Sequence, residues 1–260
     1  MNPNNFFYNL GRRTITFFRE IGSQFFLFIR LIRSGKYIYN DKDLLFEQML
    51  KMGVNSLPLV CIVSIFTGAV SAWQAAYQFR SFGLISLDIL GGATSAAIFI
   101  ELAPVLTGIV IAGRVGASIA AELGTMRVTE QIDALETLAI EPVRFLAAPR
   151  FYAGLIMLPV LVIFSNIIAH LGAFLVSFLM LDISTYTFFN SVQKYFIVYN
   201  VVSGLIKAVV FGGGTALIGC SIGFRTSGGA EGVGYSTIKA FVYSSGFILI
   251  GDYLLAVILF

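Results

Sequence analysis

Two uninterrupted uncharged runs, residues 57–79 and 151–181, constrain this chain more than any other feature of its sequence. They are 23 and 31 residues long, and about 20 apolar residues are enough for a helix to cross the hydrocarbon core of a bilayer. Hydrophobic residues make up 57% of the 260-residue chain and charged residues only 12%. Because one soluble core cannot bury so much apolar surface, the sequence predicts an integral membrane protein.

Three further apolar segments are interrupted by isolated charges. They are residues 84–113 with Asp88 and Glu101, residues 195–224 with Lys207, and residues 240–260 with Asp252. Only helices and closed barrels satisfy their backbone polar groups in lipid, and these runs are too long for barrel strands. We therefore predict an all-α protein with about five transmembrane helices.

Lysine and arginine are distributed unequally over the segments that connect these spans. Fourteen lie before the first span, between the second and third spans, or between the fourth and fifth. Only Arg80 and Lys194 lie on the other side. The positive-inside rule then places the N-terminus in the cytoplasm and the C-terminus outside. Because the basic residues have a membrane-surface role, the net charge of +3 does not require a nucleic-acid partner.

The N-terminal region carries an amphipathic pattern over residues 4–33. Its apolar residues recur at spacings of mostly three and four, and arginines occupy the opposite face. We expect a helix that lies in the cytoplasmic interface, although packing against the chain's own spans is the alternative and both can hold. Residues 1–52 then form an interfacial region, and residues 53–260 form the transmembrane domain.

A charged stretch, AELGTMRVTEQIDALE at residues 121–136, lies within the predicted cytoplasmic segment 114–150. Its composition favours a helix, which Pro142 and Pro149 would limit. Glu130, Asp133 and Glu136 recur every third residue and form an acidic strip along that helix. The strip is either a solvated face or a surface for a partner.

The isolated charges inside the spans raise a separate question. Lys207 and Asp252 both lie near the middle of their spans, where one unpaired charge costs about 2.5 to 3.5 kcal/mol on insertion scales. We therefore expect them to pair with each other, in a structural role. His170, the only histidine, also lies within a span; a hydrogen-bonded packing role is expected, and a proton relay is the alternative.

Two blocks of sequence are specific enough to indicate a family. Residues 101–150 contain E-L-x-P, A-G-R-x-G, A-E-L-G-x-M and T-E-Q-I-D-A-L, and the second block is GGAEGVGYSTIKAFVYSSGFILIGDYLLAVILF at residues 228–260. Together they closely resemble MlaE-type permeases, the membrane subunits of MCE-associated ABC transporters that move phospholipids and related lipids. Two positions depart from the pattern, because Ala103 stands where the family usually has glycine and Ile238 where a second threonine is common.

The resemblance implies a homodimeric permease in a bacterial inner membrane. Each copy would be held by a cytoplasmic ATPase, and a hexameric MCE lipid-binding protein would lie on the outer side. This chain has no G-x4-G-K-[ST] phosphate loop, so ATP and magnesium are expected in the partner, with no cofactor, metal site or enzymatic activity here. The polar helix is then comparable to the coupling helices of ABC permeases. Its expected contact residues are Glu122, Met126, Arg127, Glu130, Gln131, Asp133 and Glu136.

A lipid substrate needs a mostly apolar chamber with a few polar groups. We place this chamber where the first two spans approach each other in a dimer, and its expected residues are Trp73, Gln74, Tyr77, Ile98 and Glu101. A carboxylate near mid-membrane is costly unless it meets water, a cation or a headgroup. Glu101 therefore marks either the floor of a hydrated cavity or a structural contact with an arginine such as Arg114.

Two other functions are alternatives to lipid transport driven by ATP. A proton-coupled secondary transporter would use Glu101, His170, Lys207 and Asp252, but five spans do not divide into two matching halves. An intramembrane enzyme would need a clustered catalytic set, which the sequence does not contain. An ATP-driven lipid permease is the function that the sequence favours.

Overall fold

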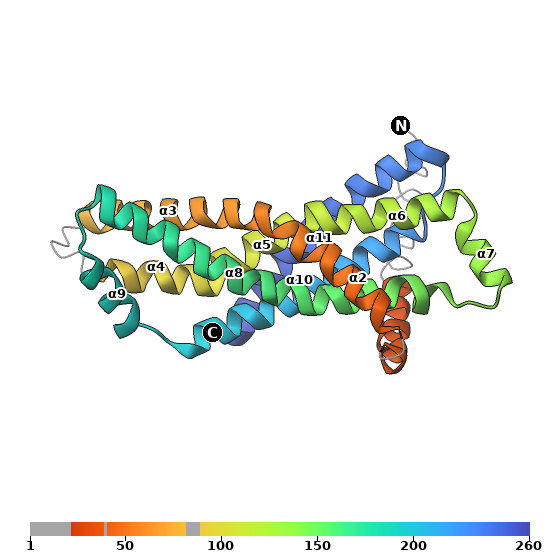
Figure 1. Ribbon diagram of the computed structural model, residues 1–260, viewed down its shortest axis with the longest axis horizontal. Helices are drawn as coiled ribbons and strands as arrows, with labels where there is room; N and C mark the ends of the chain where they lie inside the picture. The colour runs from red at the N-terminus through yellow and green to blue at the C-terminus, as the bar shows by residue number, and fades with distance from the viewer. Residues whose placement is uncertain (1–21, 39–40, 82–88) are drawn as a thin grey trace, which may run out of the picture.

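The computed structural model describes residues 22–38, 41–81 and 89–260, and these residues are predominantly helical (Figure 1). Five helical stretches are long and apolar enough to cross a membrane: Lys42–Ser81, Leu90–Val128, Val143–Met180, Val198–Gly223 and Gly229–Leu259. The prediction of an all-α membrane protein with five spans is therefore confirmed.

Each stretch is built from one or more helical elements. The first contains α2 (Lys42–Met52), the short η2 (Val54–Ser56) and α3 (Leu57–Ser81). The second contains α4 (Leu90–Ala97), η3 (Ile98–Leu102), α5 (Ala103–Ile111), η4 (Ala112–Gly116) and α6 (Ala117–Val128). The third contains η5 (Val143–Ala147) and α8 (Ala148–Met180), and the last two are α10 (Val198–Gly223) and α11 (Gly229–Leu259). The remaining elements are η1 (Gly35–Tyr37), α7 (Gln131–Thr137) and α9 (Thr185–Lys194).

The connections between the spans gather at two ends of an elongated bundle (Figure 1). α7, the turn between α10 and α11, and the N-terminal helix (residues 22–34) lie at one end. α9 and the far ends of α3 and α8 lie at the other. Successive connections therefore alternate between the two ends, as expected for spans that cross a membrane in alternating directions. Which end is cytoplasmic stays a prediction.

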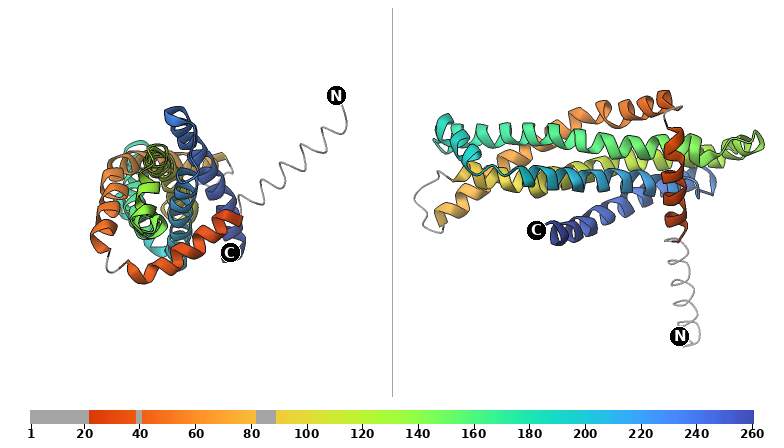
Figure 2. Two further views of the ribbon diagram at one scale, coloured as in Figure 1. Left: turned by 90° about the vertical axis from the view of Figure 1, so that its right-hand side faces the viewer. Right: turned by 90° about the horizontal axis from the view of Figure 1, so that it is seen from below.

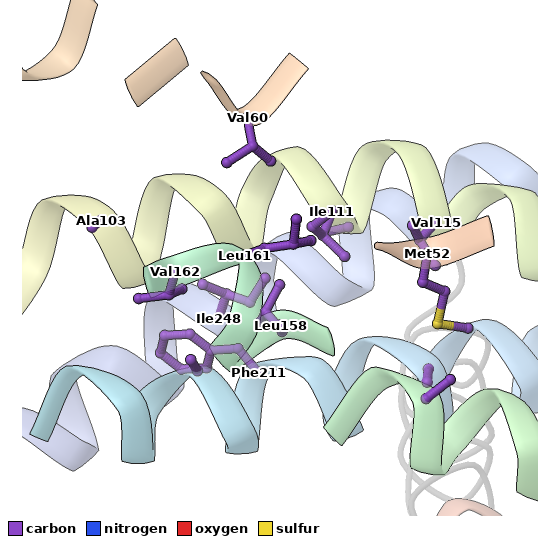
Figure 3. Close-up of a cluster of buried hydrophobic side chains, with 14 of the residues drawn as sticks. Met52, Val60, Ala103, Ile111, Val115, Leu158, Leu161, Val162, Phe211 and Ile248 are labelled. Atoms are coloured by element: carbon purple, nitrogen blue, oxygen red, sulfur yellow. The ribbon is translucent and has the colours of Figure 1, made fainter. Parts of the chain in front are cut away.

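The core forms around α8, which packs most extensively against α3 and α10. Figure 3 shows its Leu158, Leu161 and Val162 beside Phe211 of α10 and Ile248 of α11. Small residues permit this closeness. A Cβ on Gly172 would overlap the backbone oxygen of Ile65 in α3, and transmembrane helices commonly approach through such positions.

The N-terminal helix is described over residues 22–34 and runs across the long axis of the bundle (Figure 2). Leu31 is fully buried, and the rings of Phe28 and Phe151 meet edge to face with centroids 6.0 Å apart. Tyr152 of α8 donates a hydrogen bond of 3.2 Å to the Leu31 carbonyl. The helix therefore packs on its own bundle, while residues 4–21 of the predicted amphipathic segment lie outside the described residues.

The expectation of one helix over residues 121–136 is wrong. α6 continues the second membrane span as far as Val128, and α7 begins separately at Gln131. Between them, Glu130 adopts the left-handed backbone conformation with φ of 60°. The second span is consequently longer than the predicted 84–113, and the segment 114–150 begins inside a helix rather than after one.

Candidate functional site

Three charged side chains meet inside the bundle. The ammonium of Lys207 on α10 donates a hydrogen bond of 2.7 Å to Glu101 Oε1 on η3. The same nitrogen lies 2.8 Å from Asp252 Oδ1 on α11. We call Glu101, Lys207 and Asp252 the charge cluster. The expected pairing of Lys207 with Asp252 is therefore present, and it includes a second carboxylate.

The burial of the cluster is asymmetric. The Lys207 side chain is completely buried, the Asp252 side chain is 20% exposed, and the Glu101 side chain is 41% exposed. A buried ammonium without a partner would be costly in a membrane protein, so the two carboxylates stabilise it. They also give the cluster a formal excess of one negative charge when all three groups are ionised.

Pro104 explains how the chain brings Glu101 to this position. Proline has no N–H and its ring clashes with the carbonyl of residue i−4, which here is Ile100. The helix widens into the π-helical η3 just before this proline. Insertions of this kind often mark functional sites, because they redirect side chains that a regular helix would place elsewhere.

His170 does not belong to the charge cluster. Its Nδ1 lies 2.7 Å from the Asn166 carbonyl oxygen, and its Nε2 lies 2.9 Å from Ser95 Oγ. A carbonyl oxygen can only accept a hydrogen bond, so Nδ1 donates to it. When the ring is neutral, Nε2 then accepts a hydrogen bond from Ser95 Oγ. Nδ1 therefore bonds within α8, and Nε2 joins α8 to Ser95 of α4.

A groove of about 760 Å³ runs between α3 and the segment formed by η3 and α5. Leu102 and Leu106 form one wall. The α3 wall combines apolar residues with Thr67, Ser71, Gln74 and Gln78, which recur at spacings of four and three along one helical face. An open, mainly apolar groove with one polar stripe suits a molecule that has both apolar and polar parts.

The predicted chamber residues do not come together within one chain. Gln74 lines the groove, whereas Trp73 and Tyr77 are exposed on α3 beside it. Ile98 is fully buried in the core, so it does not line the groove. Glu101 instead contacts Lys207 of α10, and the expected alternative contact with Arg114 is not formed.

All of the predicted coupling residues except Glu122 lie in an elbow, defined here as residues 126–137, where α6 ends and α7 turns away. Arg127 and Asp133 form an ion pair across the break, and Met126 packs against the core. The exposed residues of the elbow include Glu130, Gln131 and Glu136. Figure 1 shows α7 at the extreme end of the molecule, where a second protein could reach these side chains.

Glu122 lies apart from the elbow and makes a different contact. Its Oε2 accepts a hydrogen bond of 3.0 Å from Arg150 Nη2 on α8. The Arg150 side chain is only 8% exposed and also donates to the Leu146 carbonyl. Glu122 therefore links α6 to α8. No local pattern in the sequence indicates that Glu122 pairs with Arg150 of the same chain instead of with a partner protein.

Most of the groove was not predicted from the sequence. Its polar residues Thr67, Ser71 and Gln78 follow the same face as Gln74. The signal was present, because these small polar residues repeat at helical spacing within a span that is otherwise apolar.

Five helical stretches long and apolar enough to cross a membrane make this chain a polytopic membrane protein. The chain belongs to the MlaE permease family, because the family model described as Permease MlaE matches residues 45–258.

Individual relatives extend this similarity over nearly the whole chain. A probable ABC transporter permease protein of Rickettsia felis is 40% identical over 256 residues, which cover 97% of this chain and 96% of that protein. The intermembrane phospholipid transport system permease protein MlaE of Haemophilus influenzae is 32% identical and covers 98% of both chains. The chloroplastic protein TRIGALACTOSYLDIACYLGLYCEROL 1 of Arabidopsis thaliana is 37% identical over 81% of this chain and 59% of its own length.

Proposed function

We propose that this chain is the transmembrane permease subunit of an ABC transporter that moves phospholipids or related lipids between the inner membrane and an MCE lipid-binding partner. Two copies form the permease, and a cytoplasmic ATPase binds each copy at its elbow. The N-terminus lies in the cytoplasm and the C-terminus in the periplasm. The chain itself has no enzymatic activity, and ATP and magnesium are bound by the ATPase.

One observation carries this proposal: a single helical stretch, Leu90–Val128, joins every part of the site. It lines the groove through Leu102 and Leu106, contributes Glu101 to the charge cluster, and ends at the elbow. A movement imposed on the elbow would therefore reach the groove along one continuous helical stretch. That connection is what a subunit driven by a separate ATPase requires.

The names of the relatives support both the proposed class of protein, an ABC transporter permease, and the proposed substrate, a phospholipid. The Rickettsia protein is named as an ABC transporter permease, and the Haemophilus protein as a phospholipid transport permease. The groove fits a lipid, because apolar residues line most of it and the polar stripe of α3 is available to a headgroup.

Dimer formation is supported by the surface of α11. Along this helix the exposed side chains include Ile250, Tyr253 and Val257, while only 11% of its most apolar window is buried inside the chain. A span that packs on α6 and α10 and yet has so little of this window buried has a large surface available for a second copy.

Reconstitution tests the proposal and separates it from proton coupling. The chain is assembled with its copurifying ATPase in liposomes containing a fluorescent phospholipid, and lipid transfer to an acceptor is measured. ATP should drive transfer, and disabling the phosphate loop of the ATPase should abolish it. Transfer that follows an imposed pH gradient without ATP would instead support the secondary transporter, and failure to copurify any ATPase would reject the proposed assembly.

A further inference from the structure

A second groove, separate from the one between α3 and α5, lies where the N-terminal helix crosses the bundle. Its volume is about 490 Å³, within the range of about 300 to 1,000 Å³ that ligand sites occupy. The N-terminal helix, α8, α10 and α11 all contribute to it, and the two grooves share no lining residue. We call it the N-terminal groove.

Aromatic rings form its walls, and the α10 backbone forms its floor. The rings belong to Phe25, Phe28, Phe151 and Phe247. Gly213 and Gly214 hollow the floor, since a Cβ on Gly214 would overlap the ring of Phe247. Such a surface is suited to a flexible hydrocarbon chain, because it offers broad apolar contact and almost no hydrogen-bonding groups.

The groove has the depth of one bilayer leaflet. Val209 and Ile218 mark its extent along α10, and at about 1.5 Å per residue they are about 14 Å apart along the helix axis. The hydrocarbon core of a bilayer is about 30 Å thick, so this length corresponds to about half of it. An acyl chain that enters at one membrane surface would therefore fill the groove without crossing into the other leaflet.

A cation lies beyond Ile218, the last α10 residue that lines the groove, because the Arg225 guanidinium turns back to Ser221. Arg225 follows the last turn of α10 and donates to the Ser221 carbonyl oxygen, to Ser221 Oγ and to Ser23 Oγ. Ser23 directly precedes Gln24, which lines the groove. Among the described residues, three of the five guanidinium N–H groups are thereby used and two are left. Within the described part of the chain, Arg225 has no carboxylate partner.

We propose that the N-terminal groove binds a resident glycerophospholipid, with one acyl chain along α10 and its phosphate at Arg225. This lipid is a structural ligand that fixes the N-terminal helix to α8 and α10, and it is not the transported molecule. The assignment follows from a leaflet-deep apolar groove that ends at a guanidinium with N–H groups to spare, because arginine binds phosphate through paired N–H donors. It stands whether or not the α3 groove carries lipid.

Native mass spectrometry of the full-length chain tests the site. The protein is reconstituted with phosphatidylethanolamine and phosphatidylglycerol, extracted in mild detergent, and assayed for lipid that stays bound. Leu217→Trp fills the groove, and Leu217→Met is the matched control that preserves its volume. Val70→Trp makes the same kind of change in the α3 groove. Arg225→Gln removes the cation, and Arg225→Lys preserves it.

The wild-type chain, Leu217→Met and Val70→Trp should retain one tightly held phospholipid per chain. Leu217→Trp should lose it, and Arg225→Gln should retain it about tenfold more weakly, because a hydrogen bond to a charged group is worth on the order of one tenfold step. Arg225→Lys should show an intermediate loss. Equal retention in all variants would overturn the proposal, and loss in Leu217→Trp without any effect of Arg225→Gln would overturn the phosphate assignment.

A photocrosslinking measurement removes any dependence on the folding of these variants. A benzophenone amino acid at Val210, in the groove, should form a phospholipid adduct that survives delipidation in detergent. The benzophenone amino acid placed instead at Ile163, which is exposed on α8 outside the groove, should lose its adduct when bulk lipid is removed. Adducts to a second copy or to the chain's own N-terminal residues at Val210 would reject a lipid as the occupant.

Discussion

Lys207 Nζ lies 2.7 Å from Glu101 Oε1, although the two residues are 106 positions apart in the chain. The contact joins α10 to the π-helical turn η3, which lies within the long helical stretch leading to the elbow. It leaves Glu101 partly exposed while Lys207 is completely buried. Any movement that separates α10 from η3 must therefore break this ion pair or give Lys207 a new partner. The energy of the charge cluster thus depends on the position of η3 relative to α10.

Replacing Lys207 with methionine should destabilise the protein more than removing either carboxylate. It leaves Glu101 and Asp252 close together without a cation, and breaking a buried ion pair by removing one partner costs about 3 to 5 kcal/mol. The cost should lie toward the lower end, because the Glu101 side chain is 41% exposed rather than fully buried. Thermal unfolding in detergent, followed by circular dichroism, measures the effect.

Neutralising the carboxylates in the same background is the control. The triple variant Lys207→Met, Glu101→Gln, Asp252→Asn has no unpaired charge and should recover much of the lost thermal stability. If Lys207→Met alone unfolds at the wild-type temperature, the cluster does not contribute to stability.

Gly172→Ala should disrupt the contact between α3 and α8. The added carbon would overlap the Ile65 carbonyl oxygen, and a backbone atom cannot move aside as a side-chain end can. Overpacking of this kind typically costs about 1 to 3 kcal/mol, sometimes more. Gly246→Ala is the matched control, because nothing lies within 4 Å of its Cβ position in α11. Equal unfolding temperatures for the two variants would contradict the close approach of the helices.

The spans were predictable because hydropathy and length are local properties of the sequence. α3, α8 and α10 begin and end within a few residues of the predicted bounds. The second and fifth spans were less predictable. Arg114 and Glu122 carry the charges expected of residues beyond a membrane exit, yet the second helical stretch continues through both, and Glu122 is held by the buried Arg150. α11 likewise begins at Gly229, ahead of the predicted 240.

The site was harder to predict than the spans because it depends on contacts between distant segments. Pairing Lys207 with Asp252 follows from the cost of isolated charges in a membrane, but that cost does not indicate a third member, Glu101. The sequence of the elbow contains no glycine or proline that would indicate the break between α6 and α7. Glu130 takes a left-handed backbone conformation that residues with side chains rarely adopt, so the structure shows a break where the sequence indicates a continuous helix.

The elbow should bind the ATPase through its exposed acidic residues. The double variant Glu130→Lys, Glu136→Lys reverses two exposed charges and leaves the ion pair between Arg127 and Asp133 unchanged. A charge pair lost at a protein interface costs about 2 to 5 kcal/mol, so copurification of the ATPase should fall sharply while the permease stays folded. Pull-down with the ATPase and size-exclusion chromatography of the permease measure both effects.

Exchanging the two partners of the elbow ion pair is the control for that experiment. Arg127→Asp with Asp133→Arg keeps an opposite pair across the break between α6 and α7, so the fold of the elbow should survive. Undiminished recovery of the ATPase by the Glu130→Lys, Glu136→Lys variant would remove these acidic residues from the interface.

The groove between α3 and α5 should contact the transported lipid, and crosslinking in membranes can show it. A benzophenone amino acid at Val70, which lines the groove and is 63% exposed, should capture phospholipid. At the fully buried Ile98 it should capture none. Leu175, 43% exposed on α8 and outside the groove, reports on bulk lipid. Because only transported lipid changes its occupancy with turnover, ATP should alter the adduct yield at Val70 and leave the yield at Leu175 unchanged. An ATP response of equal size at both positions, or at neither, would place the transport path elsewhere.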